Sequence, residues 1–401
     1  MYDVRLRDIV HINPEGVSGE LGSDTPFKYI DLSAVSRGVV NWDDLETYQT
    51  STAPSRAQRR VRLGDCLFGT VRPTQQSHGF VDRGQETLIA STGFSVLRAK
   101  AGVAEPRFIY HWMLSGEALV QAERVAVGSN YPAVNESDVA SFVVKLPSVP
   151  EQRRIADILD ALDAQIECQR RVVKKLVAVA QGVSEEQLSL IVQNVKSARL
   201  DEVADIGSGV TLGGDVESGI ELPYLRVANV QDGYIDTSEM KTVRVARSEV
   251  ARYLLEVGDV LLTEGGDIDK LGRGAVWDGR IDPCICQNHI FRVRCRRETI
   301  RPEFMAAYAG SIEGKAYFLG IAKQTTNLAT INSTQLKAMP IPLPSVVEQD
   351  RFIHLMKEAR ARLDVELAMT EKLLTLKQGL AEDLLTGRAR VPEAEAVVES
   401  L

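Results

Sequence analysis

The sequence predicts an α+β protein built as a tandem repeat, in which two mixed α/β domains are separated by two long antiparallel coiled-coil helices. Two observations lead to this prediction. The stretch LPSVPEQRRIADILDALDAQIE, which begins at Leu146, returns as LPSVVEQDRFIHLMKEARARLD from Leu343. Further blocks match in the same order at nearly constant spacing, such as RLGDCLF at 62–68 and EVGDVLL at 256–262. Self-similarity of this kind indicates a duplicated unit, so we expect pseudo-twofold symmetry between the halves.

The matching blocks also predict where the parts begin and end. We expect a first globular domain at 1–147, a first helical region at 148–196, a second globular domain at 197–344, a second helical region at 345–390 and an acidic tail at 391–401. Short stretches rich in β-branched and aromatic residues, such as KYIDL and YLRVANV, are typical of strands within the globular domains.

Both long helices begin with the same sequence signal. Ser148 is followed three residues later by Glu151, and Ser345 is followed in the same way by Glu348. A serine oxygen can accept a hydrogen bond from the third helical amide while the glutamate accepts one from the serine amide. Each pair therefore predicts a capping box.

An apolar heptad pattern follows each cap and predicts that the two helices pack on each other. The expected seam consists of Ile155, Leu159, Leu162, Ile166, Gln169, Val173 and Leu176 in the first helix and Phe352, Met356, Leu363, Glu366 and Leu373 in the second. Its polar members, Gln169 and Glu366, occupy matching places in the repeat. The alternative is that each helix packs only on its own domain.

Matching glycines, Gly182 and Gly379, are predicted to end the two helices. A helix of about 30 residues is about 45 Å long, so such a pair would hold two globular domains apart.

The composition is that of an ordinary globular protein, with 44% hydrophobic and 25% charged residues among 401. No stretch is long and apolar enough for a membrane span, and five cysteines imply no disulfide framework, so we expect a cytoplasmic protein. Cys284 and Cys286 lack a second pair at zinc-site spacing, and we predict no metal site. The formal net charge of −8 argues against nucleic-acid binding when it is averaged over the chain.

Local clusters of basic residues point the other way. Arg56, Arg59, Arg60 and Arg62 fall within a stretch that contains no acidic residue. In HIFRVRCRR, the period of a strand places Arg292, Arg294 and Arg296 on one face, and Arg98 and Lys100 hold the corresponding positions in the first half. These side chains are candidates for contact with DNA phosphates, and a simple solvated strand face is an equal alternative.

The segments that follow the two GD strands differ between the halves, unlike the strands themselves. They supply side chains that can contact base edges or phosphates: Arg72, Gln75, Gln76 and His78 in the first half, and Lys270 and Arg273 in the second. Gln can bind adenine in bidentate fashion, and Arg can bind guanine. A repeated scaffold with unlike loops is what two readers of different short sequences would need.

Catalytic motifs are absent from the sequence. It has no Asn/Asp-Pro-Pro-aromatic tetrapeptide of an adenine methyltransferase, and the glycine-rich GSGVTLGG lacks the Gly-Lys-Ser/Thr of a P-loop. The absence favours a recognition protein over an enzyme.

Taken together, the twin LPSVxEQ helices, YLRVANVQDGYID and QNHIFRVR resemble the specificity (S) subunits of type I restriction–modification systems over nearly the whole chain. The second helix departs from the family pattern, with Phe352 and His354 where the first has Ile155 and Asp157.

The resemblance implies two target recognition domains, each reading one half of a split DNA sequence, and two helical regions that dock partner subunits. The implied partners are double-stranded DNA, two methyltransferase (M) subunits and two restriction (R) subunits. S-adenosylmethionine, ATP and Mg would then be bound by partners and none of them by this chain. Base reading would fall to the loops around 70–78 and 264–273, joined by Asn130, Tyr131, Thr326 and Asn327.

Two other functions remain open at this stage. The same two-headed architecture could be a non-catalytic scaffold that binds proteins, or the chain could contain an unrecognised enzymatic site. Salt-dependent binding to duplex DNA would count against the scaffold.

Overall fold

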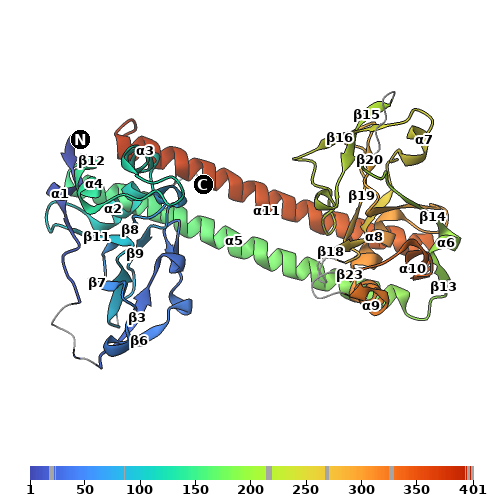
Figure 1. Cartoon of the computed structure of the whole chain (residues 1–401), viewed down its shortest axis with the longest axis horizontal. Coiled ribbons are helices and arrows are strands. Elements are labelled where there is room, and N and C mark those ends of the chain that lie inside the picture. The colour runs from blue at the N-terminus through green and yellow to red at the C-terminus, as the bar shows by residue number, and fades with distance from the viewer. Residues whose placement is uncertain are drawn as a thin grey trace. The chain divides into compact units, whose positions relative to one another are not determined.

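The computed structural model describes residues 1–17, 22, 24–84, 86–213, 219–266, 271–324, 329–392, 394 and 398. Within these residues the chain forms two compact units. Unit 1 comprises residues 1–171 and 367–401, and unit 2 comprises residues 172–366. Each unit therefore contains one globular domain together with part of each long helix (Figure 1).

The globular domain of unit 1 is built on small sheets. The described strands form the orders β6-β3-β10-β7 (Thr47–Gln49, Pro26–Ile30, Leu88–Ser91, Ala57–Val61), β2-β11-β8-β9 (Val10–Ile12, Phe94–Ala99, Cys66–Gly69, Gly79–Phe80), β1-β12 (Tyr2–Arg5, Val143–Leu146) and β4-β5 (Val35–Ser36, Val39–Val40). Pairing is antiparallel except between β3 and β10. Full burial of β8 and β10 explains why their sequences, CLFG and LIAS, are mostly apolar.

Short helices cover the second of these sheets. They are α1 (Leu6–Ile9), α2 (Pro106–Met113), α3 (Gly116–Val125) and α4 (Glu136–Ser141). Helix α2 begins with Pro106, which has no amide hydrogen to leave unpaired in the first turn. Its Phe108 and Trp112, one turn apart, are fully buried in the core of unit 1.

The globular domain of unit 2 repeats this plan. Its described strands form the orders β14-β21-β17-β19 (Ala204–Ser208, Ile290–Cys295, Val260–Thr263, Gly274–Val276), β16-β15-β20 (Lys241–Val245, Ile220–Leu225, Ile285–Cys286), β18-β23-β22 (Gly265–Gly266, Ala329–Thr330, Lys323–Gln324) and β13-β24 (Ser197–Arg199, Pro340–Pro342). The helices are α6 (Leu200–Val203), α7 (Val250–Tyr253), α8 (Pro302–Gly310), α9 (Ile312–Ile321) and α10 (Ser333–Lys337). The pair β8-β11 of the first half corresponds to β17-β21 in the second.

The long helices α5 (Val149–Val192) and α11 (Val346–Thr386) contact each other within each unit. In unit 1, Ile155 and Leu159 near the start of α5 share a core with Leu384 and Leu385 near the end of α11. In unit 2, the end of α5 and the start of α11 share a core in the same way. The start of one helix thus meets the end of the other, which confirms the predicted antiparallel packing.

Every predicted seam residue is shielded from solvent to some degree. Ile155, Leu159, Leu162, Ile166, Phe352 and Leu373 are buried, and Gln169, Val173, Leu176, Met356, Leu363 and Glu366 are partly buried. An ion pair of 2.5 Å between Asp163 of α5 and Lys377 of α11 joins the helices beside the seam in unit 1. Ile155, Leu159 and Phe352 lie in cores to which their own globular domain and the other long helix both contribute, so the seam as a whole stays a prediction.

The predicted helix ends are wrong. Both helices continue past Gly182 and Gly379, where a side chain would meet nothing within 4 Å. A glycine inside a helix costs only about 1 kcal/mol. The continuation buries Leu188 in the core of unit 2, which outweighs that cost. The helices end before residues with positive φ, Asn194 and Gly387.

The glutamine of each LPSVxEQ phrase explains why the phrase is repeated. Gln152 is fully buried; its Nε2 donates to the carbonyls of Val103 (3.1 Å) and Pro147 (3.0 Å), and its Oε1 accepts from the amide of Glu105 (2.8 Å). One side chain thus ties the first turn of α5 to the loop that precedes α2.

Gln349 makes the same three bonds in the second half. Its Nε2 donates to Thr299 (3.0 Å) and Pro344 (2.9 Å), and its Oε1 accepts from Arg301 (2.8 Å). Full burial in both halves makes these bonds necessary, because an unpaired buried amide is costly.

The capping boxes agree with the prediction in the second half only. Ser345 and Glu348 exchange amide bonds of 2.8 and 3.3 Å. In the described first half, Ser148 takes part only through its backbone carbonyl, which accepts from Gln152 at 2.8 Å. Pro150 in the first turn lowers the number of amides that need a partner there.

Replacing the buried glutamine tests its role. We expect Gln152→Ala to lower the free energy of unfolding by about 2–4 kcal/mol, because it leaves two carbonyls and an amide without partners. Chemical denaturation of the variant measures this loss. The control is Gln165→Ala, at an exposed position of the same helix. Equal unfolding curves for the two variants would contradict the prediction.

Candidate nucleic-acid interface

The strand arginine Arg98 is held inside the fold by acidic residues. Its guanidinium binds both carboxylate oxygens of Asp65 at 2.7 Å and also contacts Glu15. Asp65, the aspartate of the first GD motif, is only 1% exposed and also accepts from the amide of Arg62 at 2.8 Å. The hydrogen bond to Asp65 raises the pKa of Arg98 above its usual value. The guanidinium therefore joins β11 to the residue that precedes β8 and is not directed to solvent.

The second half repeats this arrangement with Arg294 and Asp259, which is also 1% exposed. The guanidinium binds the two Asp259 oxygens at 2.8 Å each and Glu256 at 2.6 Å. The prediction of a shared face holds for Arg292 and Arg294 of β21, but their partners are internal, and Arg296 lies beyond the end of the strand.

Other residues of the strand set also have partners within the protein. Arg292 donates to the carbonyl of Arg252 at 2.9 Å and Arg296 to that of Glu202 at 2.6 Å. Lys100 donates to the carbonyls of two residues in α1. We therefore leave Arg98, Lys100, Arg292, Arg294 and Arg296 out of the DNA-contacting set proposed below.

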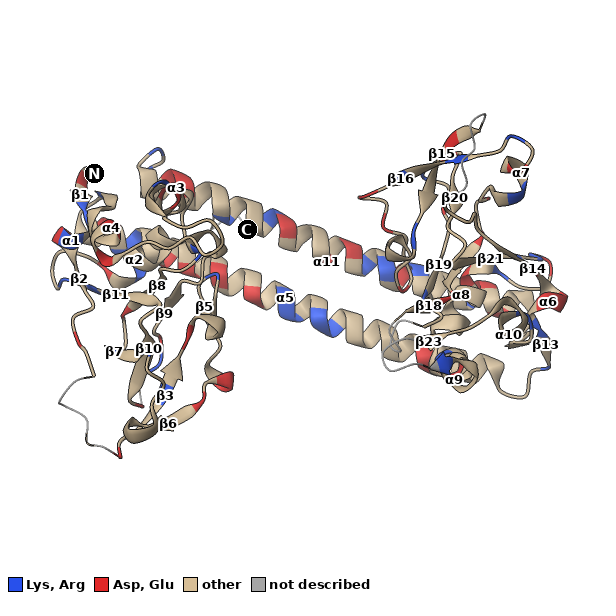
Figure 2. Ribbon diagram, viewed as in Figure 1, with Lys and Arg blue, Asp and Glu red and all other residues tan. Residues whose placement is uncertain are grey.

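The arginines of β7 and its flanks are only partly engaged. Arg56 is exposed, whereas Arg59 is half-buried with its Nε unpaired in the described structure. Arg60 lies 4.0 Å and Arg62 2.8 Å from Glu15, which neutralises part of this cluster. Acidic and basic residues are likewise interspersed over both long helices (Figure 2).

Two predicted loops meet in unit 1. Arg72 donates to the carbonyl of Asn130 at 3.1 Å, and its guanidinium lies 4.3 Å from the centre of the Tyr131 ring. Bridges between Val71 and Ala133 align the backbones of these loops. Tyr131 is 69% exposed, so the stacked pair faces solvent. An aromatic ring carrying an arginine is a surface suited to bases and phosphates.

The remaining candidates of the first half, which follow Arg72, differ in how far they are exposed to solvent. Gln75 is exposed, and Gln76 donates to the carbonyl of Leu114 at 3.2 Å. His78 is only 2% exposed, stacks on Phe68 and accepts from the amide of Gly69 at 3.0 Å. The prediction that His78 is available to DNA is wrong, because the ring belongs to the core of the domain.

The second half has a comparable meeting of loops. Strand β18 pairs with β23, so the segment after the second GD strand lies beside the segment that precedes α10. Arg273 donates to Gln231 at 2.9 Å. Lys270, Thr326 and Asn327 lie outside the described residues.

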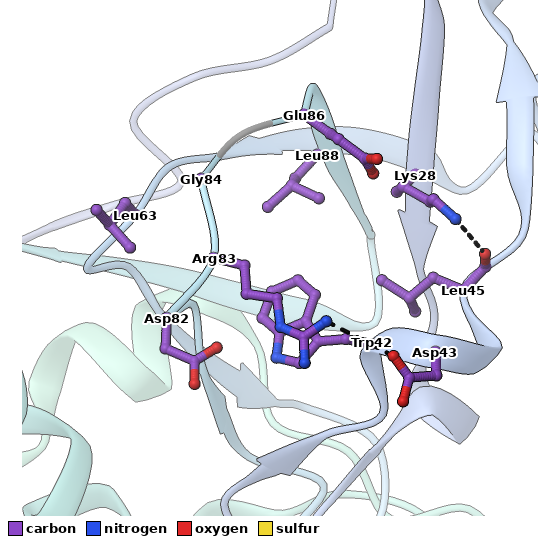
Figure 3. Close-up of a pocket in the computed structure, with 10 residues that line it drawn as sticks. All are labelled: Lys28, Trp42, Asp43, Leu45, Leu63, Asp82, Arg83, Gly84, Glu86 and Leu88. Atoms are coloured by element: carbon purple, nitrogen blue, oxygen red, sulfur yellow. Dashed lines mark hydrogen bonds and ion pairs between the residues drawn. The ribbon is translucent and has the colours of Figure 1, made fainter.

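Sequence reasoning missed two hollows. In unit 1, a hollow of about 890 Å³ contains Trp42, beside which the guanidinium of Arg83 lies 5.5 Å from the ring centre and 3.6 Å from Asp43 (Figure 3). Asp82 and Glu86 also line it, so the wall has both signs of charge. A second, polar hollow lies in unit 2 and contains His289 and Glu264. Neither forms a sequence motif, because segments far apart in the sequence supply the residues.

Among the described residues, no group of three or more histidines, cysteines, aspartates or glutamates could hold a metal ion. No helix in the same part of the chain is long and apolar enough to cross a membrane.

Comparison with known proteins shows which proteins the chain is similar to. Residues 68–176 match the type I restriction modification DNA specificity domain. The chain is 26% identical over 132 residues to the type I restriction enzyme HindI specificity subunit of Haemophilus influenzae, covering 32% of this chain and 29% of that protein. It is 21% identical over 296 residues to the EcoKI specificity subunit of Escherichia coli, covering 69% of this chain and 63% of the relative. The aligned part thus spans less than two thirds of each relative.

Solved structures share the fold. A chain from a study of complex assembly and conformational transition of the type I R-M system aligns with a TM-score of 0.67 and 22% identity, covering 96% of this chain and 97% of that one. The HsdS subunit of Thermoanaerobacter tengcongensis aligns with a TM-score of 0.53 and 23% identity over 97% of both chains. The resemblance to type I specificity subunits that the sequence indicates is confirmed.

The role of Arg98 can be separated from DNA contact. We expect Arg98→Ala to lower the free energy of unfolding by about 3–5 kcal/mol, because the buried Asp65 carboxylate loses its partner. The exposed Arg56→Ala is the control and should change it by less than about 0.5 kcal/mol. Denaturation curves of the two variants measure the difference. Unchanged stability with weaker duplex binding in Arg98→Ala would contradict this assignment.

Burial of His78 predicts a pH dependence of stability. Desolvation lowers the pKa of His78 to about 3, whereas in the unfolded chain it is about 6.5. The unfolded state therefore binds the proton first, and stability that is full above about pH 6.5 falls toward pH 3 by up to about 1.4 kcal/mol per unit. His78→Asn should flatten this slope in unfolding curves measured between pH 7 and 4. The same slope in both proteins would assign the effect to other groups.

Proposed function

We propose that the chain is the DNA-specificity subunit of a type I restriction–modification complex. Each half would recognise one part of a bipartite, asymmetric DNA sequence. One observation supports this most directly: the scaffold is repeated down to its buried bonds, while the side chains at the loops differ. Gln152 and Gln349 make matching bonds, whereas Tyr131, which stacks with Arg72 in the first half, aligns with Leu328 in the second.

In this proposal residues 1–147 and 197–344 are the target recognition domains. The first contacts DNA through exposed or half-buried side chains of β7 and its flank, of the turn at 72–76 and of the loop at 130–131. The proposed set is Arg56, Arg59, Arg60, Arg72, Gln75, Gln76, Asn130 and Tyr131. Arg273, Lys270, Thr326 and Asn327 belong to the corresponding loops of the second domain.

The helical regions at 148–196 and 345–390 would dock M subunits. Exposed apolar residues on α11 favour this role: Val347, Leu355, Val365 and Met369 follow one another at intervals of eight, ten and four residues, and Val365 is 67% exposed. Exposed apolar side chains on a helix are typical of a surface that a partner covers.

Catalysis would belong to the partners in the cytoplasm. Two M subunits would bind S-adenosylmethionine and modify adenine, and two R subunits would use ATP and Mg. The chain itself would act without a bound cofactor, by selecting the DNA sequence.

The modified sequence in a host that carries the intact system tests the proposal. We expect two short elements separated by a spacer of indifferent sequence, about one helical turn from centre to centre. Sequencing of modified bases across the genome measures this. Exchanging residues 1–147 for those of a relative should change one element only. A continuous recognition sequence would refute bipartite reading.

A further inference from the structure

We infer that the polar hollow of unit 2 is the base-contacting site of the second target recognition domain, with Glu264 and His289 as its reading pair. This inference rests on the function proposed above. The hollow has a volume of about 390 Å³. Its lining includes Gly209, Arg252, Tyr253, Glu264, Asn288 and His289.

The hollow is built at the ends of two paired strands. Glu264 directly follows β17 and His289 directly precedes β21, and the amide of Glu264 donates to the carbonyl of His289 at 3.0 Å. Their side chains also meet, with Nδ1 of His289 2.7 Å from Oε2 of Glu264. Gly209 allows the wall to close in, because a Cβ there would lie 2.0 Å from the carbonyl oxygen of Cys286.

The side-chain pair is not needed to hold the strands together. In the first half the corresponding residues are Thr70 and Gly93, and the amide of Thr70 donates to the carbonyl of Gly93 at 2.8 Å. The backbone bond is therefore the same in both halves, without any acid–imidazole pair in the first. The side chains of Glu264 and His289 are thus additions to a strand pair that its backbone hydrogen bond already joins.

The groups in the hollow suit the edge of a base. With Nδ1 of His289 donating to Glu264, the ring orientation is fixed and its Nε2 is left as a hydrogen-bond acceptor. A Glu oxygen can accept from the exocyclic amino group of cytosine, and the amide of Asn288 can bind adenine. His289 is 57% exposed at its side chain, so a ligand can reach it.

A positively charged side chain, Arg252, lines the same hollow. Arg252 is exposed, and its guanidinium is 5.4 Å from the ring centre of Tyr253. Phosphate contacts fix the position of a protein on a duplex, and base contacts then specify the sequence. The hollow thus offers a phosphate contact and a base contact side by side. Its arginine and tyrosine resemble the Arg72–Tyr131 pair, and the acid–imidazole pair of Glu264 and His289 is what it adds.

Variants of the full chain, assembled with its M subunits, test the inference. Binding is measured to duplexes in which each base pair of the recognition sequence is replaced in turn. We expect His289→Ala and Glu264→Gln to reduce discrimination at one or two positions of one element by about tenfold or more. Arg72→Ala should affect the other element. Arg280→Ala, which removes an exposed ion pair with Asp278 in the same domain, is the control and should leave all positions unchanged.

Each other outcome overturns the inference. Unchanged discrimination in His289→Ala and Glu264→Gln would show that the hollow does not read bases. A lowered midpoint of thermal unfolding with loss of binding to every duplex would make the pair structural. A continuous recognition sequence for the unaltered complex would instead refute the proposed function, whatever the variants do.

Discussion

The attachment of each long helix to its globular domain depends on one buried glutamine side chain. Gln152 and Gln349 each join the first helical turn to a loop through two backbone groups. These are the carbonyl of one loop residue and the amide of the residue two positions later. Because these bonds are buried, any other orientation of the helix would leave polar groups unpaired. The direction in which the helix leaves the domain is therefore fixed within the first turn.

A second pair of buried contacts fixes the sheet in each half. The GD aspartates, Asp65 and Asp259, each accept from a backbone amide and from an arginine on the neighbouring strand. Each aspartate directly precedes the strand, β8 or β17, that leads into a loop with candidate DNA contacts. A loop that follows such a rigid strand can change its sequence while its starting point stays in place. This separation accounts for strands that match across the repeat and loops that do not.

The parts of the fold that were predictable are those set by local pattern or by duplication. Heptad periodicity predicted positions of α5 and α11 that are buried or partly buried, and the repeat revealed two similar domains. The helix ends were not predictable, because Gly182 and Gly379 are tolerated only through burial of residues farther along, such as Leu188. Period two placed the arginines of β21 on one face correctly. It could not reveal that Asp259, distant in sequence, neutralises Arg294.

The candidate site was predictable only in part, because its contacts join residues that are distant in the sequence. Only the family resemblance grouped the loop around 70–78 with Asn130 and Tyr131, and the contact of Arg72 with both residues is seen in the structure. The burial of His78 did not, since one histidine in a polar loop looks the same whether it points in or out. Glu264 and His289 were missed because 25 residues of chain separate them and only strand pairing brings them together.

The core of each unit includes residues from the end of a long helix that begins at the other globular domain. Leu384 and Leu385 of α11, with Val391 and Ala394 from the segment expected to be a tail, are buried in the core of the first domain, and Leu188 of α5 is buried in that of the second. A gene crossover at the midpoint of the chain would therefore join a domain to a foreign helix end. Crossovers at the domain–helix boundaries keep the helices native, and the incoming domain then needs only a matching apolar socket. Exchange of one globular domain is thus constrained by the shape of that socket more than by the candidate DNA-contacting loops.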